Sequence, residues 1–278
     1  MKYSVTSYSF SQYKKAGKLD PLSMIDKAKE LGFDGIEFTD RDVDGIEGAK
    51  ALRAHAAELD FPIVNLAAHG DILAPDGVNE LLKQVDLAAA LGVTQMRHDV
   101  ASGKDLASFE GYENVLPRLV EGCRTVTEYA RSLGIRTMTE NHGRFSQDSL
   151  RVEKLINSVA SDNFGWLVDV GNFLCADDDP AVAVGRAAKY AFHVHCKDFL
   201  VKKGDVVNPG RGFILSRGGA YLRGTIIGHG AVPVLQCLRA LTFAGYDGWI
   251  TVEFEGMEDC IEGCAVGLEN LRRYVSLC

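Results

Sequence analysis

Short apolar runs rich in β-prone side chains alternate along the chain with longer segments whose apolar residues recur at helical spacing. Between the first two runs, Asp20-Pro21 is typical of a helix cap followed by a first-turn proline. Later helical segments end at Leu-Gly pairs such as Leu133-Gly134, after which the next run begins at once. We therefore predict eight strands, at residues 3–8, 35–38, 62–68, 93–97, 135–139, 165–168, 191–195 and 249–254.

This unbroken alternation predicts one α/β domain over residues 1–278. Eight strand-helix units favour a closed (β/α)8 TIM barrel over an open sheet, since no linker marks a second domain. One interval departs from the rhythm, because residues 199–230 show no clear helix or strand pattern and are rich in glycine and arginine. We expect a long loop there after the seventh strand, either a binding lid or a disordered insertion.

Composition narrows the class of protein. The formal net charge of −8 argues against a nucleic-acid partner, which a basic surface would favour. The seven cysteines include no C-x-x-C pair, a usage typical of reduced thiols in the cytoplasm. No apolar stretch reaches the length of a signal peptide or membrane span. We expect a cytoplasmic protein with a small-molecule substrate and no membrane partner.

Several predicted strands end in side chains that can bind metals. In a (β/α)8 barrel the active site lies at the carboxyl ends of the strands. Polar residues at those ends are Glu37, His69, His98, Asp99, Glu140, Asp169, His193 or His195, and Glu253 or Glu255. Any one of them is more often a helix cap or an ion-pair partner, but carboxylates gathered at one mouth require a cation. Three carboxylates and one imidazole predict one divalent ion, with Mn²⁺ or Mg²⁺ favoured and Co²⁺ or Zn²⁺ also compatible.

Two ambiguities in this set follow from strand geometry. His193 and His195 lie two residues apart, as do Glu253 and Glu255, so within each pair both side chains share one face of a strand. Strand position alone therefore leaves both pairs open.

The motifs ENHG, VDVGN, HVHCKD and TVEFEG, in this order, resemble the sugar phosphate isomerase/epimerase family of xylose isomerase-like barrels. The resemblance covers nearly the whole chain and is strongest from Ile135 onward. It implies that Glu140, Asp169, His195 and Glu253 are the metal ligands, and that Glu140 and Glu253 are also the acid/base pair. Glu253 is favoured over Glu255 because the family ligand directly follows the apolar strand, and His193 then belongs to the barrel interior.

Other polar residues are candidates for substrate binding. Lys197 follows the histidine in the family's H-x-K-D pattern and would either polarise a substrate oxygen or neutralise a ligand carboxylate. Arginines in the long loop suit a phosphate group, with solvated surface charge as the plain alternative. The full set of candidates is His69, His98, His142, Asn172, Lys197, Arg211, Arg217 and Arg223.

The resemblance implies a metal-dependent sugar or sugar phosphate isomerase or epimerase that transfers a proton through a metal-stabilised enediolate. Its partner would be a small carbohydrate, and a homo-oligomer is compatible with the sequence. The alternative is a dehydratase or lyase acting on a keto-sugar or inositol derivative. A phosphodiesterase of the same superfamily is less favoured, because its zinc cluster needs a histidine where Asn172 stands. A non-catalytic sugar-binding barrel is disfavoured because all four ligand positions are filled.

Overall fold

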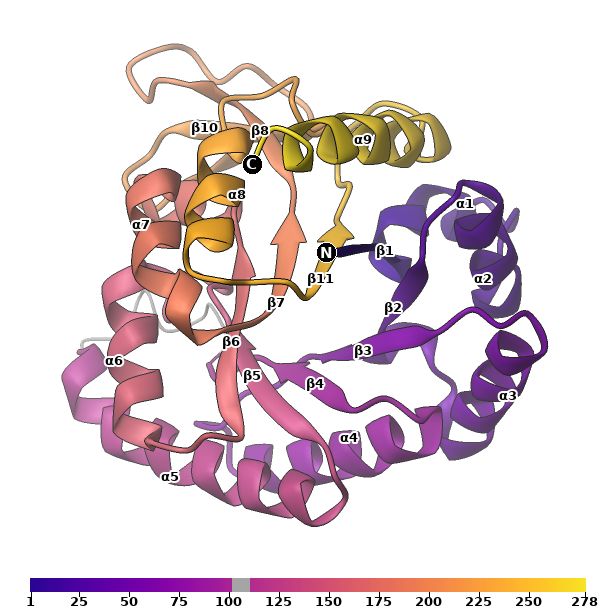
Figure 1. The fold of residues 1–278 in the computed structure, drawn as a ribbon. Coiled ribbons are helices and arrows are strands. Elements are labelled where there is room, and N and C mark those ends of the chain that lie inside the picture. The colour runs from indigo at the N-terminus through magenta and orange to yellow at the C-terminus, as the bar shows by residue number, and fades with distance from the viewer. Residues whose placement is uncertain (102–110) are drawn as a thin grey trace.

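Eight parallel strands close into a barrel surrounded by helices in the computed structural model, which describes residues 1–101 and 111–278 (Figure 1). The strand order around the barrel is β1-β11-β7-β6-β5-β4-β3-β2. The fold is therefore the predicted (β/α)8 TIM barrel. The barrel strands are β1 (Lys2–Thr6), β2 (Gly35–Thr39), β3 (Ile63–Ala68), β4 (Gln95–His98), β5 (Arg136–Glu140), β6 (Phe164–Asp169), β7 (Ala191–Cys196) and β11 (Trp249–Val252).

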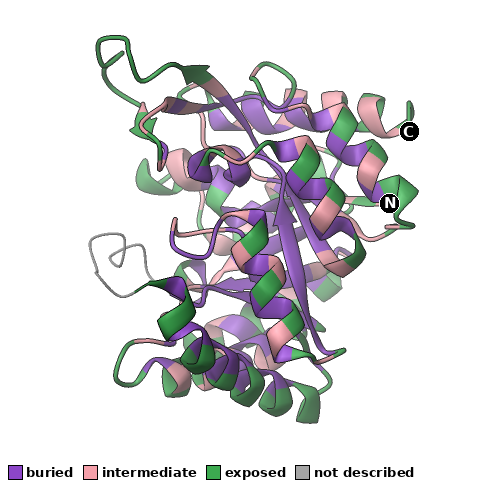
Figure 2. Ribbon diagram, turned by 90° about the vertical axis from the view of Figure 1, so that its left-hand side faces the viewer, coloured by how far each residue is buried: buried purple, intermediate pink, exposed green. Residues whose placement is uncertain are grey.

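The longer helices pack their apolar faces on the outside of the barrel, so buried residues line their inner sides (Figure 2). The α-helices are α1 (Ser11–Lys15), α2 (Pro21–Glu30), α3 (Gly45–Glu58), α4 (Gly77–Leu91), α5 (Tyr112–Ser132), α6 (Ser149–Val159), α7 (Pro180–Ala187), α8 (Val234–Phe243) and α9 (Cys260–Val275). Short 3-10 turns are η1 (Ser7–Phe10), η2 (Asp40–Asp42), η4 (Asn172–Ala176) and η5 (Ala188–Tyr190).

The local signals in the sequence act as expected at helix ends. Asp20 caps α2 by accepting from the Ser23 backbone N–H, while the Ser23 hydroxyl accepts from the Asp20 backbone N–H. Gly134, two residues after the end of α5, takes a left-handed φ of 73°. That conformation reverses the chain without a Cβ clash and lets β5 begin two residues later.

Strand register places the polar strand ends at one level of the barrel. Asp169 on β6 pairs with His195 on β7, and His195 pairs with Thr251 on β11. On the other side of the barrel, Glu37 on β2 pairs with Asn65 on β3. Because all eight strands are parallel, their carboxyl ends open into the same mouth.

The interval after β7 differs from the expectation of no regular structure. It contains three antiparallel strands, β8 (Asp198–Lys202), β9 (Ile214–Leu215) and β10 (Tyr221–Thr225), in the order β8-β10-β9. Phe199 and Leu222 from this sheet are buried with Cys175 in a small apolar cluster separate from the main core. These strands are only two to five residues long and are separated by glycine-rich turns, so the apolar pattern is too weak to identify them. Figure 1 shows β8 and β10 rising beyond the barrel.

Two further observations bear on the class of protein. All seven cysteines are free thiols, and six of them are buried. Among the residues that the structure describes, no helix combines the length and the apolar character needed to cross a bilayer.

Gly35 is predicted to be essential for the packing of β2. A Cβ at this position would lie 2.8 Å from Val64 Cγ1 and 2.9 Å from the Pro62 carbonyl oxygen, so the neighbouring backbone would have to shift. We expect Gly35→Ala to lower the free energy of unfolding by roughly 1–3 kcal/mol in urea denaturation. Gly185→Ala is the matched control, since a Cβ there meets nothing within 4 Å and alanine favours helix α7. Equal stability of the two variants would contradict the prediction.

Candidate metal and substrate site

The four predicted metal ligands converge at the carboxyl end of the barrel. Glu140 ends β5, Asp169 ends β6, His195 lies in β7, and Glu253 directly follows β11. Each offers a ligand atom, and these atoms all lie within 4.8 Å of one another. Residues separated by more than a hundred positions in the sequence thus form one cluster of three carboxylates and one imidazole.

The cluster has the properties of a cation site. Asp169 Oδ2 is buried and has no hydrogen-bond partner among the described residues. Burial is the main cause that raises the pKa of Asp169 to about 7; the ammonium of Lys197 lowers this pKa, and the charges of Glu253 and Glu140 raise it further. A divalent ion would relieve this repulsion, and an oxygen-rich set with one nitrogen suits such an ion. The residues present therefore fit a divalent metal.

Lys197 lies within the same group of carboxylates. Its buried ammonium is 2.8 Å from Glu253 Oε2, 3.3 Å from Asp169 Oδ2 and 3.6 Å from Glu255 Oε1. Burial lowers the pKa of Lys197, but these carboxylates more than offset it and raise the pKa well above its ordinary value. Lys197 therefore remains a cation and partly neutralises the ligand carboxylates.

Glu140 is restrained on both of its carboxylate oxygens. Arg97 Nε donates to Oε2 at 2.6 Å, and Asn172 Nδ2 donates to Oε1 at 2.8 Å. Arg97 is buried and also pairs with Asp99, 3.1 Å away. Arg97 was not among the site residues predicted from the sequence, although an arginine inside a predicted strand is itself a signal, because a buried guanidinium requires a carboxylate partner.

His195 is held between two carboxylates. Its Nδ1 is 3.1 Å from Glu253 Oε2, and its Nε2 is 3.0 Å from Glu37 Oε2. Burial raises the pKa of Glu37, but the imidazoles of His195 and His193 outweigh this and lower it overall. The sequence indicated Glu37 as a strand end but not as a neighbour of the ligand set.

His193 lies inside the barrel, as expected. Its Nδ1 is 2.9 Å from Gln95 Nε2, and its Nε2 is 2.6 Å from Thr251 Oγ1. Burial lowers the pKa of His193 to about 3, so the ring is neutral. Both ring nitrogens are engaged in the wall of the barrel.

A cavity of about 350 Å³ opens beside the ligand cluster. His69 and His142 line it, with their Nδ1 atoms 2.6 Å from Asp40 Oδ1 and 2.9 Å from Asp99 Oδ1, respectively. This arrangement leaves Nε2 of each ring for a ligand. The complete lining is Thr6, Tyr8, Glu37, Thr39, Arg41, Ala67, His69, Arg97, Glu140, His142, His195, Lys197, Glu253 and Glu255. It is polar, and it suits a small molecule rich in hydroxyl groups.

Two predicted substrate contacts near the mouth lie outside this lining because they are buried behind it. Asn172 is buried and donates to Glu140, so it supports a predicted ligand. His98 is fully buried and its ring packs against Phe164. The structure does not bring either residue to the cavity, and their contact with a substrate stays a prediction.

The three arginines of the long segment after β7 also lie outside the cavity lining. Arg217 pairs with Asp148 at 3.0 Å and Arg223 with Glu258 at 3.3 Å, while Arg211 is exposed. Their contact with a phosphate group therefore stays a prediction as well.

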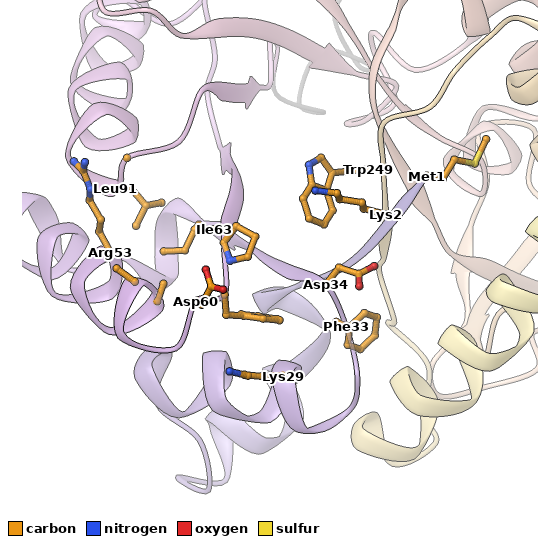
Figure 3. Close-up of a pocket in the computed structure, with 15 residues that line it drawn as sticks. Met1, Lys2, Lys29, Phe33, Asp34, Arg53, Asp60, Ile63, Leu91 and Trp249 are labelled. Carbon is orange, nitrogen blue, oxygen red and sulfur yellow. The ribbon is translucent and has the colours of Figure 1, made fainter.

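A larger cavity, about 910 Å³, lies at the opposite end of the barrel (Figure 3). Its lining includes Lys2, Asp34, Ile63 and Trp249, at or next to the amino ends of β1, β2, β3 and β11. None of the predicted metal ligands lines it. In barrels of this architecture that end contributes to stability, whereas the chemistry lies at the carboxyl end.

The sequence profile of the xylose isomerase-like TIM barrel family matches residues 25–274. The chain belongs to this family. It is 33% identical over 159 residues to the rhizopine catabolism protein MocC of Rhizobium meliloti, a match covering 54% of this chain and 48% of MocC. It is 25% identical over 186 residues to an inosose dehydratase of Lacticaseibacillus casei, covering 63% of this chain and 61% of the dehydratase. The matches thus span about half and about three-fifths of these relatives.

Solved structures share the fold at low sequence identity. The probable 3-DHS dehydratase AsbF from Bacillus anthracis superposes with a TM-score of 0.76 at 17% identity, covering 98% of this chain and 99% of AsbF. D-Psicose 3-epimerase from Clostridium cellulolyticum superposes with a TM-score of 0.76 at 17% sequence identity, and the match covers 99% of both chains. The IOLI protein with a binding zinc atom superposes with a TM-score of 0.76 at 16% sequence identity, and the match covers 100% of this chain and 99% of the IOLI chain. These matches establish the architecture and leave the reaction open.

His98 is predicted to make stability depend on pH. Burial lowers its pKa to about 4, against 6.5 for an exposed ring, so between these values the unfolded state binds more protons. Stability therefore falls as pH falls. When the pH falls from 7 to 5, we expect His98 to lower the free energy of unfolding by roughly 1–2 kcal/mol. Urea denaturation of His98→Gln at both pH values should show a smaller loss than the wild type.

The control for this experiment is His229→Gln, because His229 is exposed. It should keep the wild-type dependence on pH. If the free energy of unfolding of His98→Gln differs between pH 7 and pH 5 as much as that of the wild type, the buried ring of His98 is not the source of the pH dependence.

Proposed function

We propose that this protein is a divalent-metal-dependent dehydratase that removes a proton beside the ketone of a cyclic polyol or related sugar and eliminates water. Glu140, Asp169, His195 and Glu253 would hold the ion. Once bound, the cation withdraws charge from substrate oxygens and thereby acidifies the carbon next to the carbonyl. The relatives named as inosose dehydratases support a ketone of an inositol as the substrate class.

The observation on which the choice of reaction rests is the unequal restraint of the two glutamates. Glu140 accepts hydrogen bonds on both oxygens, one from the guanidinium of Arg97, and only 3% of its side chain is exposed. Glu253 is 14% exposed, and its contacts with His195 and Lys197 involve Oε2 alone. Because both oxygens of Glu140 are engaged, this carboxylate cannot turn toward a substrate without breaking a hydrogen bond, whereas Oε1 of Glu253 lies outside those contacts. Glu253 is the better base.

A reaction with one carboxylate base fits elimination. Glu253 takes the proton from the carbon beside the ketone, and the electron pair of that C–H bond forms a C=C bond. The C–O bond at the next carbon then breaks, and its hydroxyl leaves as water with a proton from the ring of His142; Glu253 releases the proton that it took, and His142 is reprotonated, through solvent. His69 and His142 present ring nitrogens to the cavity and are the groups we assign to contact this hydroxyl.

Isomerisation or epimerisation is the second candidate. It is favoured by the presence of both Glu140 and Glu253 in the cavity lining, because a second carboxylate could return the proton to the opposite face. The firm hold of Arg97 on Glu140 weighs against it.

The two reactions are separated by their products. Metal-stripped protein would be reloaded with Mn²⁺, Mg²⁺, Co²⁺ or Zn²⁺ and incubated in D₂O with an inosose and with a panel of ketohexoses. We expect mass spectrometry to show loss of one water from the inosose, with a new ultraviolet absorbance from the conjugated product. Epimerised ketohexose that takes up deuterium without loss of water would favour the second candidate.

Substitution of the glutamates tests their roles. We expect Glu253→Gln to lower kcat by about 10²–10⁴-fold, because the base is lost. Glu140→Gln should chiefly weaken metal binding, measured by calorimetric titration. Glu153→Gln, which changes an ion-pairing residue of helix α6, is the control and should keep wild-type activity. Full activity in Glu253→Gln, or in protein freed of metal, would refute the proposed function.

A further inference from the structure

We propose that Glu37 is a positioning residue that orients the ring of His195, so that Nδ1 rather than Nε2 serves the metal. This inference deepens the proposed function and rests on it. It concerns β2, which lies in the half of the barrel that contributes none of the four predicted ligands.

Glu37 forms a fixed acceptor for one nitrogen of His195. Its Oε2 is 3.0 Å from His195 Nε2 and also accepts from Asn65 Nδ2 at 2.8 Å. Glu37 and Asn65 are fully buried, and strand pairing sets them side by side on β2 and β3. An ionised carboxylate only accepts hydrogen bonds, so Nε2 must be the N–H donor in this contact.

The other ring nitrogen then faces the predicted ligands. His195 Nδ1 lies 3.1 Å from Glu253 Oε2, in the group formed with Glu140 and Asp169. In the metal-free ring both nitrogens face carboxylates and both can donate; a cation held by Glu140, Asp169 and Glu253 would displace the proton on Nδ1, while Nε2 keeps the proton that it donates to Glu37. A carboxylate behind a metal-binding histidine fixes both the tautomer and the ring orientation.

Glu37, His193 and His195 also lie within 4.8 Å of one another, an arrangement that could be mistaken for a second cation site. The contacts of His193 argue against it. Its Nδ1 faces Gln95 and its Nε2 faces Thr251, whose hydroxyl lies 2.7 Å from that of Ser4. With both nitrogens engaged, His193 has no lone pair for a metal, although its Nε2 lies 3.5 Å from Glu37 Oε2. Gln95, His193, Thr251 and Ser4 instead form a hydrogen-bonded chain across the barrel.

Two substitutions separate the charge of Glu37 from its role as acceptor. Glu37→Gln keeps an acceptor oxygen but removes the charge, whereas Glu37→Leu removes both. We expect calorimetric titration of metal-stripped protein with Zn²⁺ and Mn²⁺ to show binding weakened by about 10-fold in Glu37→Gln and about 100-fold in Glu37→Leu.

Nitrogen-15 NMR of histidine rings adds a readout that general destabilisation would not change. In the zinc-loaded wild type, the His195 ring, assigned by its loss in His195→Asn, should have the proton on Nε2. In Glu37→Gln these signals should shift. Asp42→Asn is the matched control, since Asp42 is a buried carboxylate that contacts Ser7, Thr39 and Lys14 but no predicted ligand. It should bind metal within about twofold of wild type, because it lies outside the contacts that orient a ligand.

The outcomes separate the inference from the proposed function. Wild-type affinity and unshifted His195 signals in Glu37→Gln would overturn the inference while leaving the metal site intact. Two bound ions in wild type and one in Glu37→Leu would overturn it in favour of a cation at Glu37, His193 and His195. If wild type binds neither ion, the proposed function fails, and the metal-free NMR spectra still decide whether Glu37 sets the state of the His195 ring. If Glu37→Leu does not fold, Glu37→Gln alone decides between these outcomes.

Discussion

Buried carboxylates of like charge repel one another strongly, and this barrel gathers Glu37, Glu140, Asp169, Glu253 and Glu255 around one mouth. Nearly every other feature of the site compensates for that repulsion. Arg97 pairs with Glu140, Lys197 pairs with Asp169 and Glu253, and His195 lies between Glu253 and Glu37. Burial, together with the charges of Glu253 and Glu140, keeps the pKa of Asp169 raised even so. A divalent ion would offset the remaining repulsion.

This compensation also makes the carboxylates unequal, and that inequality bears on the chemistry. The hold of Arg97 and Asn172 on Glu140 makes it a fixed ligand, while Glu253 is more open to the cavity. Solved structures with this fold include a probable dehydratase and an epimerase, so the fold alone does not set the reaction. Arg97 and Glu37 each restrain a predicted ligand from outside the set.

The cavity walls reflect the same principle. His69 and His142 are each anchored by an aspartate, so their rings present a second nitrogen to a ligand in a set orientation. Sites held by such contacts bind with less loss of side-chain entropy. The three-stranded sheet after β7 rises beyond the barrel near this mouth. Within this segment, Arg217 forms an ion pair with Asp148, and Arg223 forms one with Glu258. Recognition of a phosphate by this segment thus has less support than recognition of hydroxyl groups in the cavity.

By itself the sequence determined the architecture and the predicted ligand set. Periodicity and local caps act over a few residues, so the eight barrel strands and the glycine that ends α5 could be predicted within a few positions. The resemblance of four strand-end motifs to a known family implied Glu140, Asp169, His195 and Glu253 as the ligands. Only the tertiary structure decided which partners these residues have. The contacts of Glu37 with His195 and of Arg97 with Glu140 join distant strands, and β8 and β10 are defined by pairing with each other. Such contacts depend on closure of the barrel, which no local pattern in the chain encodes.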